Sequence, residues 1–325
     1  MKKIISIIYI LFICIFLSSC LNQSVIYQSE YIAIVGLEHR IDNYIGYFFL
    51  PSTNDLGTKK ENGEEKSIAT VLGKTIFDVF SNLELSSTLT MNFKHISSFV
   101  LHESMLNESD IMKFIYYVRD SDKLDINFDV FATNESIKDI FSIKNPNNES
   151  LILTMLIEPN LSKYVFLSAN PIHYLNFARN YLDNKVFGIP LINIEKIWDD
   201  ELSLNGKGIC FISRKCNIIP DNDSGYKFLK SNSSLEYNDN CIEASFEKYD
   251  VKYKYKDKIY IKIKAECKII YSCDGIEKNK YLENKLKENI IEALEIENKI
   301  DILNYDYYKI KNKSYELDIN IKFNN

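Results

Sequence analysis

The first twenty residues constrain this chain more than any other feature. Two lysines precede an apolar run from Ile4 to Leu17, and two serines follow it. A basic start, an apolar run and small residues form the arrangement of a secretory signal peptide. Fourteen helical residues span about 21 Å, which is short of the hydrocarbon core of about 30 Å. We therefore expect this segment to direct export rather than to remain as a spanning helix.

The quartet from Leu17 to Cys20 resembles a bacterial lipobox, LSSC. In that pattern the Cys20 thiol takes a diacylglycerol, and cleavage leaves Cys20 as the first residue. Two acyl chains anchor a protein stably where one does not. The expected organisation is a lipoprotein signal peptide over 1–19 and a tether over 20–30, with the chain held on the extracytoplasmic face of the membrane. A plain signal peptide with an incidental cysteine and an uncleaved anchor helix remain alternatives.

Composition excludes several classes of protein. Hydrophobic residues make up 46% and charged residues 26% of the 325 residues, which is ordinary for a globular protein and excludes a largely disordered or polytopic membrane chain. With a net charge of −6, the chain is a poor candidate for binding nucleic acid by charge alone. Only 10 glycines are present, and the chain has no G-x-S-x-G, Walker or dinucleotide-binding motif.

Hydrophobic periodicity predicts an α+β fold with several domains, built from mixed or antiparallel sheets that are each packed with helices. We expect a first domain over 31–195 and a second over 205–325, divided near 195–205. In the first domain we expect strands at 31–37, 44–50, 96–101 and 125–131. We expect helices at 68–83 (capped by Ser67), to about Val118 (capped by Ser109 or Asp110), at 134–141 and at 171–182. At 187–194 we expect the chain to leave the first domain and enter the next one.

The second domain has a different pattern. Short strands are expected at 208–212, 216–219, 241–246 and 251–255, with a capped helix at 221–230. The segment 260–271 alternates Ile261, Ile263 and Ala265 with charged residues, which is typical of a sheet with one wet face. Residues 277–299 predict a long amphipathic helix, and 315–323 a final strand. The tyrosines at 253, 255, 305, 307 and 308 fit either a partner surface or the wet face of a sheet edge.

Other reactive residues are given structural roles. We expect His95 to hydrogen-bond its backbone neighbours in the core, and Arg119 to pair with Asp120 at a helix end. Neither His95 nor His102 has the spacing of a helical metal pair. Besides Cys14 and Cys20 there are five cysteines, an odd number that cannot pair fully. They are Cys210, Cys216, Cys241, Cys267 and Cys273. None of their spacings fits a zinc site, so we expect no metal and no cofactor.

The order of several short segments behind the lipobox resembles the Ger(x)C family of spore germination proteins. The positions that carry the resemblance are Gly73, His95, Arg119, Asp120, Pro190, Gly208, Phe211 and Asp301. Leu21 stands where the family has a tryptophan, and Asn304 where a glycine is common. The segment between Asp301 and the last strand is short, so the C-terminal part is trimmed relative to the family.

The resemblance implies a subunit without enzymatic activity. Family members are the lipoprotein C subunits of nutrient germinant receptors, which lie in the inner membrane of the spore. They act with an integral-membrane A-type subunit and a transporter-like B-type subunit, and the complex responds to amino acids, sugars or nucleosides. The expected function is a docking subunit of such a receptor, required for germination. The main alternative is an extracytoplasmic solute-binding lipoprotein, and an extracytoplasmic enzyme is the third.

Overall fold

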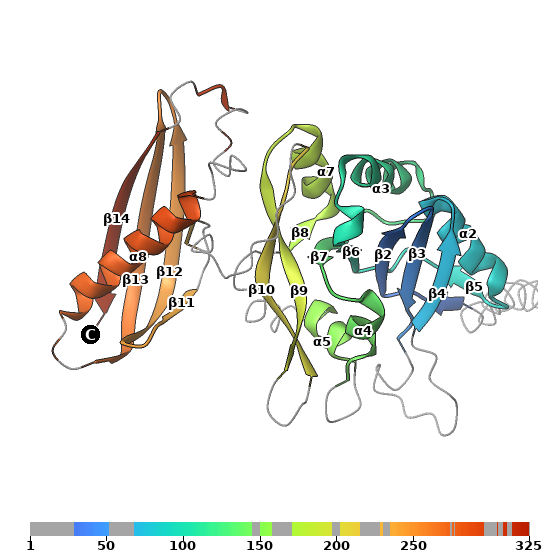
Figure 1. Cartoon of the computed structure of the whole chain (residues 1–325), viewed down its shortest axis with the longest axis horizontal. Helices are drawn as coiled ribbons and strands as arrows, with labels where there is room; N and C mark the ends of the chain where they lie inside the picture. The colour runs from blue at the N-terminus through green and yellow to red at the C-terminus, as the bar shows by residue number, and fades with distance from the viewer. Residues whose placement is uncertain are drawn as a thin grey trace, which may run out of the picture.

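The structure is a computed structural model. It describes residues 29–51, 68–144, 150–157, 171–196, 202–214, 228–229, 235–273, 275, 277–295, 304, 308–310 and 314–324. Two sheets dominate it, a larger one built mainly from the first half of the chain and a smaller one at the C-terminal end (Figure 1). The mixed α and β content and the separate helix-packed sheets confirm the predicted fold class.

The larger sheet has the strand order β10-β9-β7-β6-β2-β3-β4, and β8 pairs with β7. Neighbours are parallel from β2 through β6 and β7 to β9, and antiparallel toward both edges. The central strands are apolar on both faces because helices cover both. The strands are β2 (Ile34–Arg40), β3 (Asn43–Phe49), β4 (Ile68–Gly73), β6 (Ser98–His102), β7 (Asp129–Thr133), β8 (Ile172–His173), β9 (Phe187–Lys196) and β10 (Leu202–Ile212).

Helices pack on both faces of this sheet, which gives three layers (Figure 1). One face carries α2 (Ile76–Ser86), α3 (Glu108–Asp120) and α7 (Tyr174–Leu182) over a core rich in phenylalanine. The other carries α4 (Ile137–Ser142) and α5 (Leu151–Ile157). A short parallel pair, β1 (Ser29–Tyr31) and β5 (Thr90–Asn92), lies beside them, and a 3-10 turn, η2 (Glu103–Met105), leads from β6 toward α3.

The smaller sheet has the order β11-β12-β13-β14, and α8 lies across one face of it (Figure 1). Ile261, Ile263 and Ala265 of β13 are buried under α8, whereas Lys262 and Lys264 are exposed, as their alternation predicts. The elements are β11 (Leu235–Asn238), β12 (Ile242–Tyr255), β13 (Ile259–Ser272), α8 (Lys278–Glu295) and β14 (Tyr315–Asn324).

The helix predicted over 68–83 is wrong in its first half. Residues 68–73 form the edge strand β4, which pairs with β3 along its whole length. The helix begins only at Ile76, where Thr75 and Asp78 form a reciprocal capping box. Ser67 is therefore not the N-cap. The apolar residues of 68–72 fit either period, and pairing with a strand more than twenty residues earlier decided between them.

Other element boundaries also differ. The alternating segment 125–131 becomes a strand only at Asp129, helix α4 begins after Ser136, and helix α3 is capped by Asn107. The two strands expected at 241–246 and 251–255 are one long strand, β12, whose pairing with β13 shifts register twice. Such irregularities interrupt an alternating pattern without ending the strand. The strand expected at 216–219 lies outside the described residues, as does the helix expected at 221–230 except for residues 228–229.

Strand β10 joins the two parts of the molecule. It is hydrogen-bonded to β9 at the edge of the larger sheet. Cys210 and Ile212 face the core of that sheet, whereas Ile209 and Phe211 pack in the core of the smaller sheet. One strand thus contributes alternate side chains to both cores. The division near 195–205 stays a prediction.

Candidate functional site

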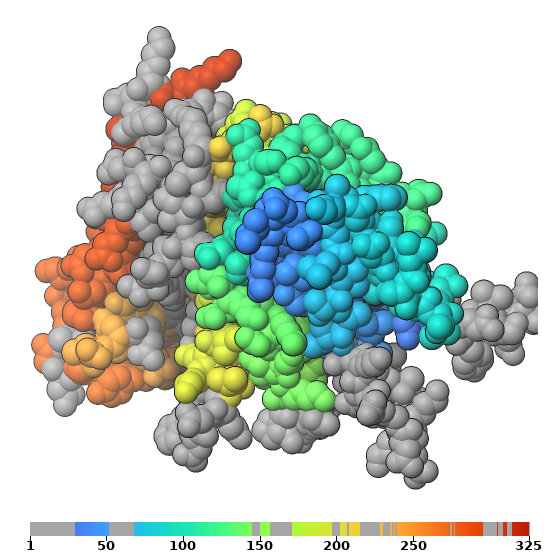
Figure 2. All heavy atoms as spheres, turned by 45° about the vertical axis from the view of Figure 1, so that its right-hand side comes forward, coloured from blue at the N-terminus to red at the C-terminus, as the bar shows by residue number. Residues whose placement is uncertain are grey.

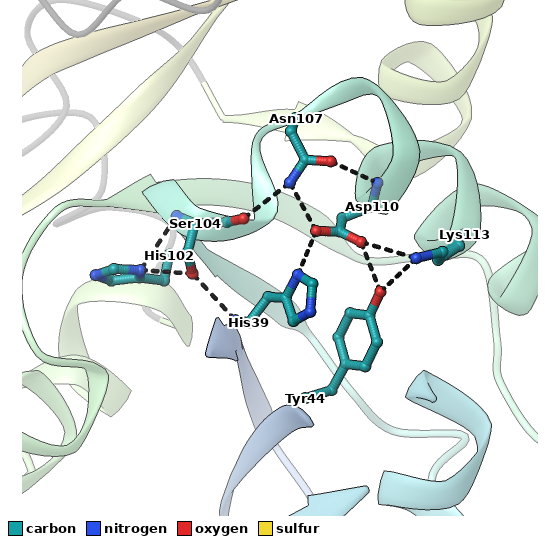
Figure 3. Close-up of polar contacts among 7 residues, drawn as sticks. All are labelled: His39, Tyr44, His102, Ser104, Asn107, Asp110 and Lys113. Carbon is teal, nitrogen blue, oxygen red and sulfur yellow. Dashed lines mark hydrogen bonds and ion pairs between the residues drawn. The ribbon is translucent and has the colours of Figure 1, made fainter. Parts of the chain in front are cut away.

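A cluster of polar side chains lies at the carboxyl ends of β2 and β6, where open sheets commonly present functional groups. His39 comes from the end of β2, Tyr44 from the start of β3 and Ser104 from η2. Helix α3 and its cap supply Asn107, Asp110 and Lys113 (Figure 3). We call these six residues the Asp110 cluster. Its members come from segments up to 74 residues apart in the sequence, from His39 to Lys113.

Asp110 is the centre of the cluster, and its side chain is only 2% exposed. Its Oδ1 accepts hydrogen bonds from the Tyr44 hydroxyl at 2.5 Å and from Lys113 Nζ at 3.2 Å. Its Oδ2 accepts from Asn107 Nδ2 and lies 2.6 Å from His39 Nδ1. Burial opposes ionisation, but these hydrogen bonds outweigh it and hold the pKa of Asp110 below its ordinary value. The buried acid is thus an anion with four donors.

The donors are themselves held in place. The His39 ring stacks on the Tyr44 ring with centroids 4.4 Å apart and planes 7° from parallel. Lys113 Nζ donates to the Tyr44 hydroxyl at 2.8 Å. Burial and the bond to Asp110 raise the pKa of Tyr44, and the bond to Tyr44 raises the pKa of Lys113. Tyr44 therefore stays a neutral donor and Lys113 a cation at neutral pH.

Serine and histidine also meet here, but not in a nucleophile–base arrangement. The Ser104 hydroxyl lies 2.9 Å from His102 Nδ1 and accepts the backbone N–H of His39. His102 Nδ1 also accepts the backbone N–H of Ser104, which makes His102 the cap of η2. The His39 ring faces Asp110 rather than Ser104. The contacts therefore fix a loop and do not pass a proton from serine to acid. Within the described part of the chain, no group of three His, Cys, Asp or Glu side chains could hold a metal.

A cavity of about 530 Å³ adjoins the cluster between α2 and α3. Tyr44 and Lys113 line it, together with the aromatic rings of Phe80 and Tyr117. Near its other end Lys123 pairs with Glu84 at 2.7 Å. Its volume falls in the range of small-molecule sites, which combine an apolar lining with a few polar groups. The Asp110 cluster thus holds one wall of a space large enough for a small solute.

Several residues that carried the resemblance have packing or surface positions in the structure. A Cβ on Gly73 would lie 2.5 Å from the backbone nitrogen of Val79, so only glycine lets β4 approach α2 here. Arg119 and Asp120 form the expected exposed ion pair, with Nε and Oδ1 2.6 Å apart. The prediction that His95 lies in the core is wrong. His95 is exposed, and its ring lies 5.4 Å from that of Tyr31. It follows the buried Phe93 in a turn, where solvent can satisfy its ring nitrogens.

Three further positions that carried the resemblance, Pro190, Gly208 and Phe211, lie on β9 and β10. Pro190 of β9 is paired with Ile209 of β10, one residue beyond Gly208. Phe211 is fully buried in the smaller core. Cys20 and Asp301 lie outside the described residues, so the lipidation site and the helix-ending aspartate stay predictions.

Two features were beyond sequence reasoning. Sequence reasoning does not find the Asp110 cluster, because Asp110 reads there as a possible helix N-cap and its partners His39 and Tyr44 are about seventy residues away. The sequence does not distinguish a partner surface from a sheet edge for the tyrosines of β12, and in the structure they pack against other residues. Tyr255 stacks on Tyr308 with centroids 3.7 Å apart, and Tyr253 donates to the backbone oxygen of Leu229. Tyr305 and Tyr307 lie outside the described residues.

Asn304 stands where the resembled family commonly has glycine, and its backbone has φ of 59°. Asparagine tolerates this left-handed conformation better than most residues. Its side chain also accepts the Val186 N–H at 2.6 Å and donates to the Val186 oxygen at 3.0 Å. The substitution therefore preserves the backbone turn and fastens it to the segment before β9.

Comparison with known proteins decides the family. The sequence model of the spore germination protein N-terminal domain matches residues 22–194, which is more than half of the chain. The chain belongs to the Ger(x)C family of spore germination proteins. The matched region contains the larger sheet up to β9, the Asp110 cluster and the cavity.

The chain was also compared with solved structures and with curated proteins. A solved structure described as "Crystal Structure of the GerBC protein" is similar to this family member, with 15% identity and a TM-score of 0.48. The similarity covers 90% of this chain and 97% of that one. No curated protein matches the sequence. In the described residues, no helix is long and apolar enough to cross a membrane.

Proposed function

We propose that this protein is the lipid-anchored C subunit of a nutrient germinant receptor, and that it acts as a non-catalytic docking subunit. The family match over residues 22–194 carries the proposal. The lipobox at Cys20 supplies the anchor, since a diacylglycerol confines the chain to the membrane surface. Confinement raises the effective concentration of the subunit at its integral-membrane A-type and B-type partners.

Exposed apolar side chains support docking by the α2 side of the larger sheet. Phe77 and Leu85 of α2 are 65% and 84% exposed. Figure 2 turns this side toward the viewer, and the cyan segment that contains β4 and α2 lies at the surface. Grouped exposed apolar residues commonly mark protein interfaces. We assign the contact with the integral-membrane subunits to this side.

Replacement of the lipidated residue tests the anchor. Spores carrying Cys20→Ala should lose nutrient-triggered germination, and the protein should leave the membrane fraction. Cys14→Ala, within the apolar segment of the signal peptide, is the matched control and should behave as wild type. Immunoblots establish that both variants accumulate. Normal germination of Cys20→Ala spores, with the protein released from the membrane, would refute the tethering role.

The cavity supports a second candidate function, solute binding by the lipoprotein itself. Its volume of about 530 Å³ and its aromatic lining would accommodate an amino acid, a nucleoside or a sugar. Ligand-observed NMR with each of these classes tests this function. A saturable signal that disappears in Ser81→Trp, which fills the cavity, would support solute binding if circular dichroism is unchanged. No saturable signal from any class would exclude it.

A further inference from the structure

Two partly exposed cysteines flank the long hairpin of the smaller sheet. Ile242, the first residue of β12, pairs with Ser272, the last residue of β13. Cys241 and Cys273 are the next residues outward on the two strands, so they stand opposite each other. The backbone N–H of Cys273 donates to the oxygen of Cys241 at 2.8 Å, which continues the pairing by one step.

The separation of these residues suits a covalent link. Opposed residues of a hydrogen-bonded antiparallel pair have Cα atoms about 5.5 Å apart. Disulfides join Cα atoms about 4.4–6.8 Å apart, so the backbone need not move. Hydrogen bonding with Cys273 raises the pKa of Cys241. The Cys273 thiol also reaches the Asn240 oxygen at 3.6 Å.

The turn before Cys241 is held rigidly. Asp239 Oδ1 accepts the backbone N–H groups of Cys241 and Ile242, each at 2.8 Å. Its Oδ2 accepts the hydroxyls of Tyr237 at 2.8 Å and of Tyr281, from α8, at 3.1 Å. These bonds hold the pKa of Asp239 below its ordinary value in spite of partial burial. Cys241 is therefore positioned by four hydrogen bonds that converge on one carboxylate.

Two other described cysteines are protected from reaction. Cys210 and Cys267 are fully buried. Burial raises the pKa of both thiols, that of Cys267 to about 11. Only a thiolate attacks a disulfide, and access is also needed. The pKa of Cys241 is raised as well, so access makes the difference: Cys241 and Cys273 are partly exposed, and oxidation should select them over the two buried thiols.

We propose that Cys241 and Cys273 form a disulfide that closes the open end of the β12–β13 hairpin. The oxidant is a second disulfide, belonging to a thiol–disulfide oxidoreductase or to a small molecule. One cysteine thiolate attacks that disulfide and expels one thiol, which leaves a mixed disulfide. The second cysteine then attacks the mixed disulfide at the protein sulfur, the Cys241–Cys273 bond forms, and the second thiol leaves. Two cysteine protons pass to the two released thiols, and the oxidant gains two electrons.

The expected compartment favours this reaction, because disulfides persist outside the cytoplasmic membrane. The compartment follows from the proposed lipid-anchored topology, whereas the geometry of the two cysteines is independent of it. The test therefore uses purified full-length protein in detergent, and its result is independent of the germination assay. A failed cross-link would leave the anchor proposal intact, and a failed anchor would leave the cross-link intact.

The experiment oxidises the folded protein with excess 2-hydroxyethyl disulfide at pH 8.5. Unreacted thiols are then alkylated under denaturing conditions, and peptides are analysed by mass spectrometry. We expect one cross-linked pair containing Cys241 and Cys273, which dithiothreitol separates, and full alkylation of Cys267. Cys267→Ser, six residues away near the end of β13, is the matched control and should keep the cross-link.

Two results would overturn the proposal. One is recovery of both cysteines of folded wild type as free thiols or as mixed disulfides with the reagent. The other is linkage of either cysteine to Cys216 instead. In Cys241→Ser the remaining Cys273 should stop at the mixed disulfide. The wild-type result decides the question by itself if that variant fails to fold.

Discussion

The carboxylate of Asp110, in the first turn of α3, lies 2.6 Å from the imidazole Nδ1 of His39, at the end of β2. This contact joins the strand to the helix across 71 residues of sequence. Because Asp110 is buried and bonded to four side chains, it holds β2, β3 and α3 together at the edge of the cavity. The Asp110 cluster is thus a structural support for the cavity wall.

Asp110→Asn should destabilise the protein by about 1.5–3 kcal/mol, the range for hydrogen bonds to a charged group. The amide removes the negative charge, and its NH2 group replaces one of the two carboxylate oxygens. That NH2 group would face two donors, either His39 and Asn107 or Tyr44 and Lys113. Urea unfolding measures the loss. Asp122→Asn, at an exposed acid beside the same cavity, should change stability by less than about 0.5 kcal/mol. Equal effects at both positions would contradict the role given to Asp110.

The Asp110 contribution should depend on pH. The folded-state pKa of Asp110 is lowered, so the unfolded chain binds the proton more readily. Its stabilisation is therefore fully present above the unfolded pKa of about 3.9, and it is lost as pH falls through the lower folded pKa. The stability difference between wild type and Asp110→Asn should be constant from pH 6 to 7 and should shrink below about pH 4. A difference that grows on acidification would contradict this sign.

Gly73→Ala should destabilise the contact of β4 with α2 by about 1–3 kcal/mol, the cost of overpacking. The added carbon would lie 2.5 Å from the Val79 nitrogen and 2.9 Å from the Asp78 carbonyl carbon, and backbone atoms cannot rotate away. Thermal unfolding provides the measurement. Thr70→Ala, at an exposed position of the same strand, is the control and should have little effect. A neutral Gly73→Ala would show that the strand can shift.

Variants of Asn304 should rank in a defined order. Asn304→Gly keeps the left-handed backbone but loses two hydrogen bonds to Val186, at about 0.5–1.5 kcal/mol each. Asn304→Ala loses the same bonds and adds about 1–2 kcal/mol of backbone strain. Stability should therefore fall from wild type through glycine to alanine. Chemical denaturation tests the order, and an alanine variant more stable than the glycine variant would contradict it.

The docking side should be sensitive to charge. Phe77→Asp combined with Leu85→Asp places two charges among exposed apolar residues and should reduce co-purification with the integral-membrane subunits. Because both side chains are largely exposed, folding should be preserved. Leu175→Asp, at a comparably exposed position of α7, is the matched control and should co-purify normally. Loss of co-purification in the control alone would move the docking side to α7.

The sequence predicts those helices and strands in which the spacing of apolar residues is regular along the element. Helix α8 and strands β13 and β14 were placed within a few residues, because their apolar positions repeat at 3.6 or 2 residues without interruption. The segment 68–73 was assigned to a helix because its apolar residues satisfy both periods. The Arg119–Asp120 pair was predicted because its members are neighbours.

The sequence by itself determined the alternating strands and the amphipathic helices, since each depends on the order of nearby side chains. The tertiary structure decided which strands pair and which side chains converge. It placed β4 at the sheet edge, divided the side chains of β10 between two cores and brought His39 and Tyr44 to Asp110. It also set Cys241 opposite Cys273. These contacts join residues tens of positions apart, and only the pairing of whole strands and the burial of both faces of a sheet fix such distances.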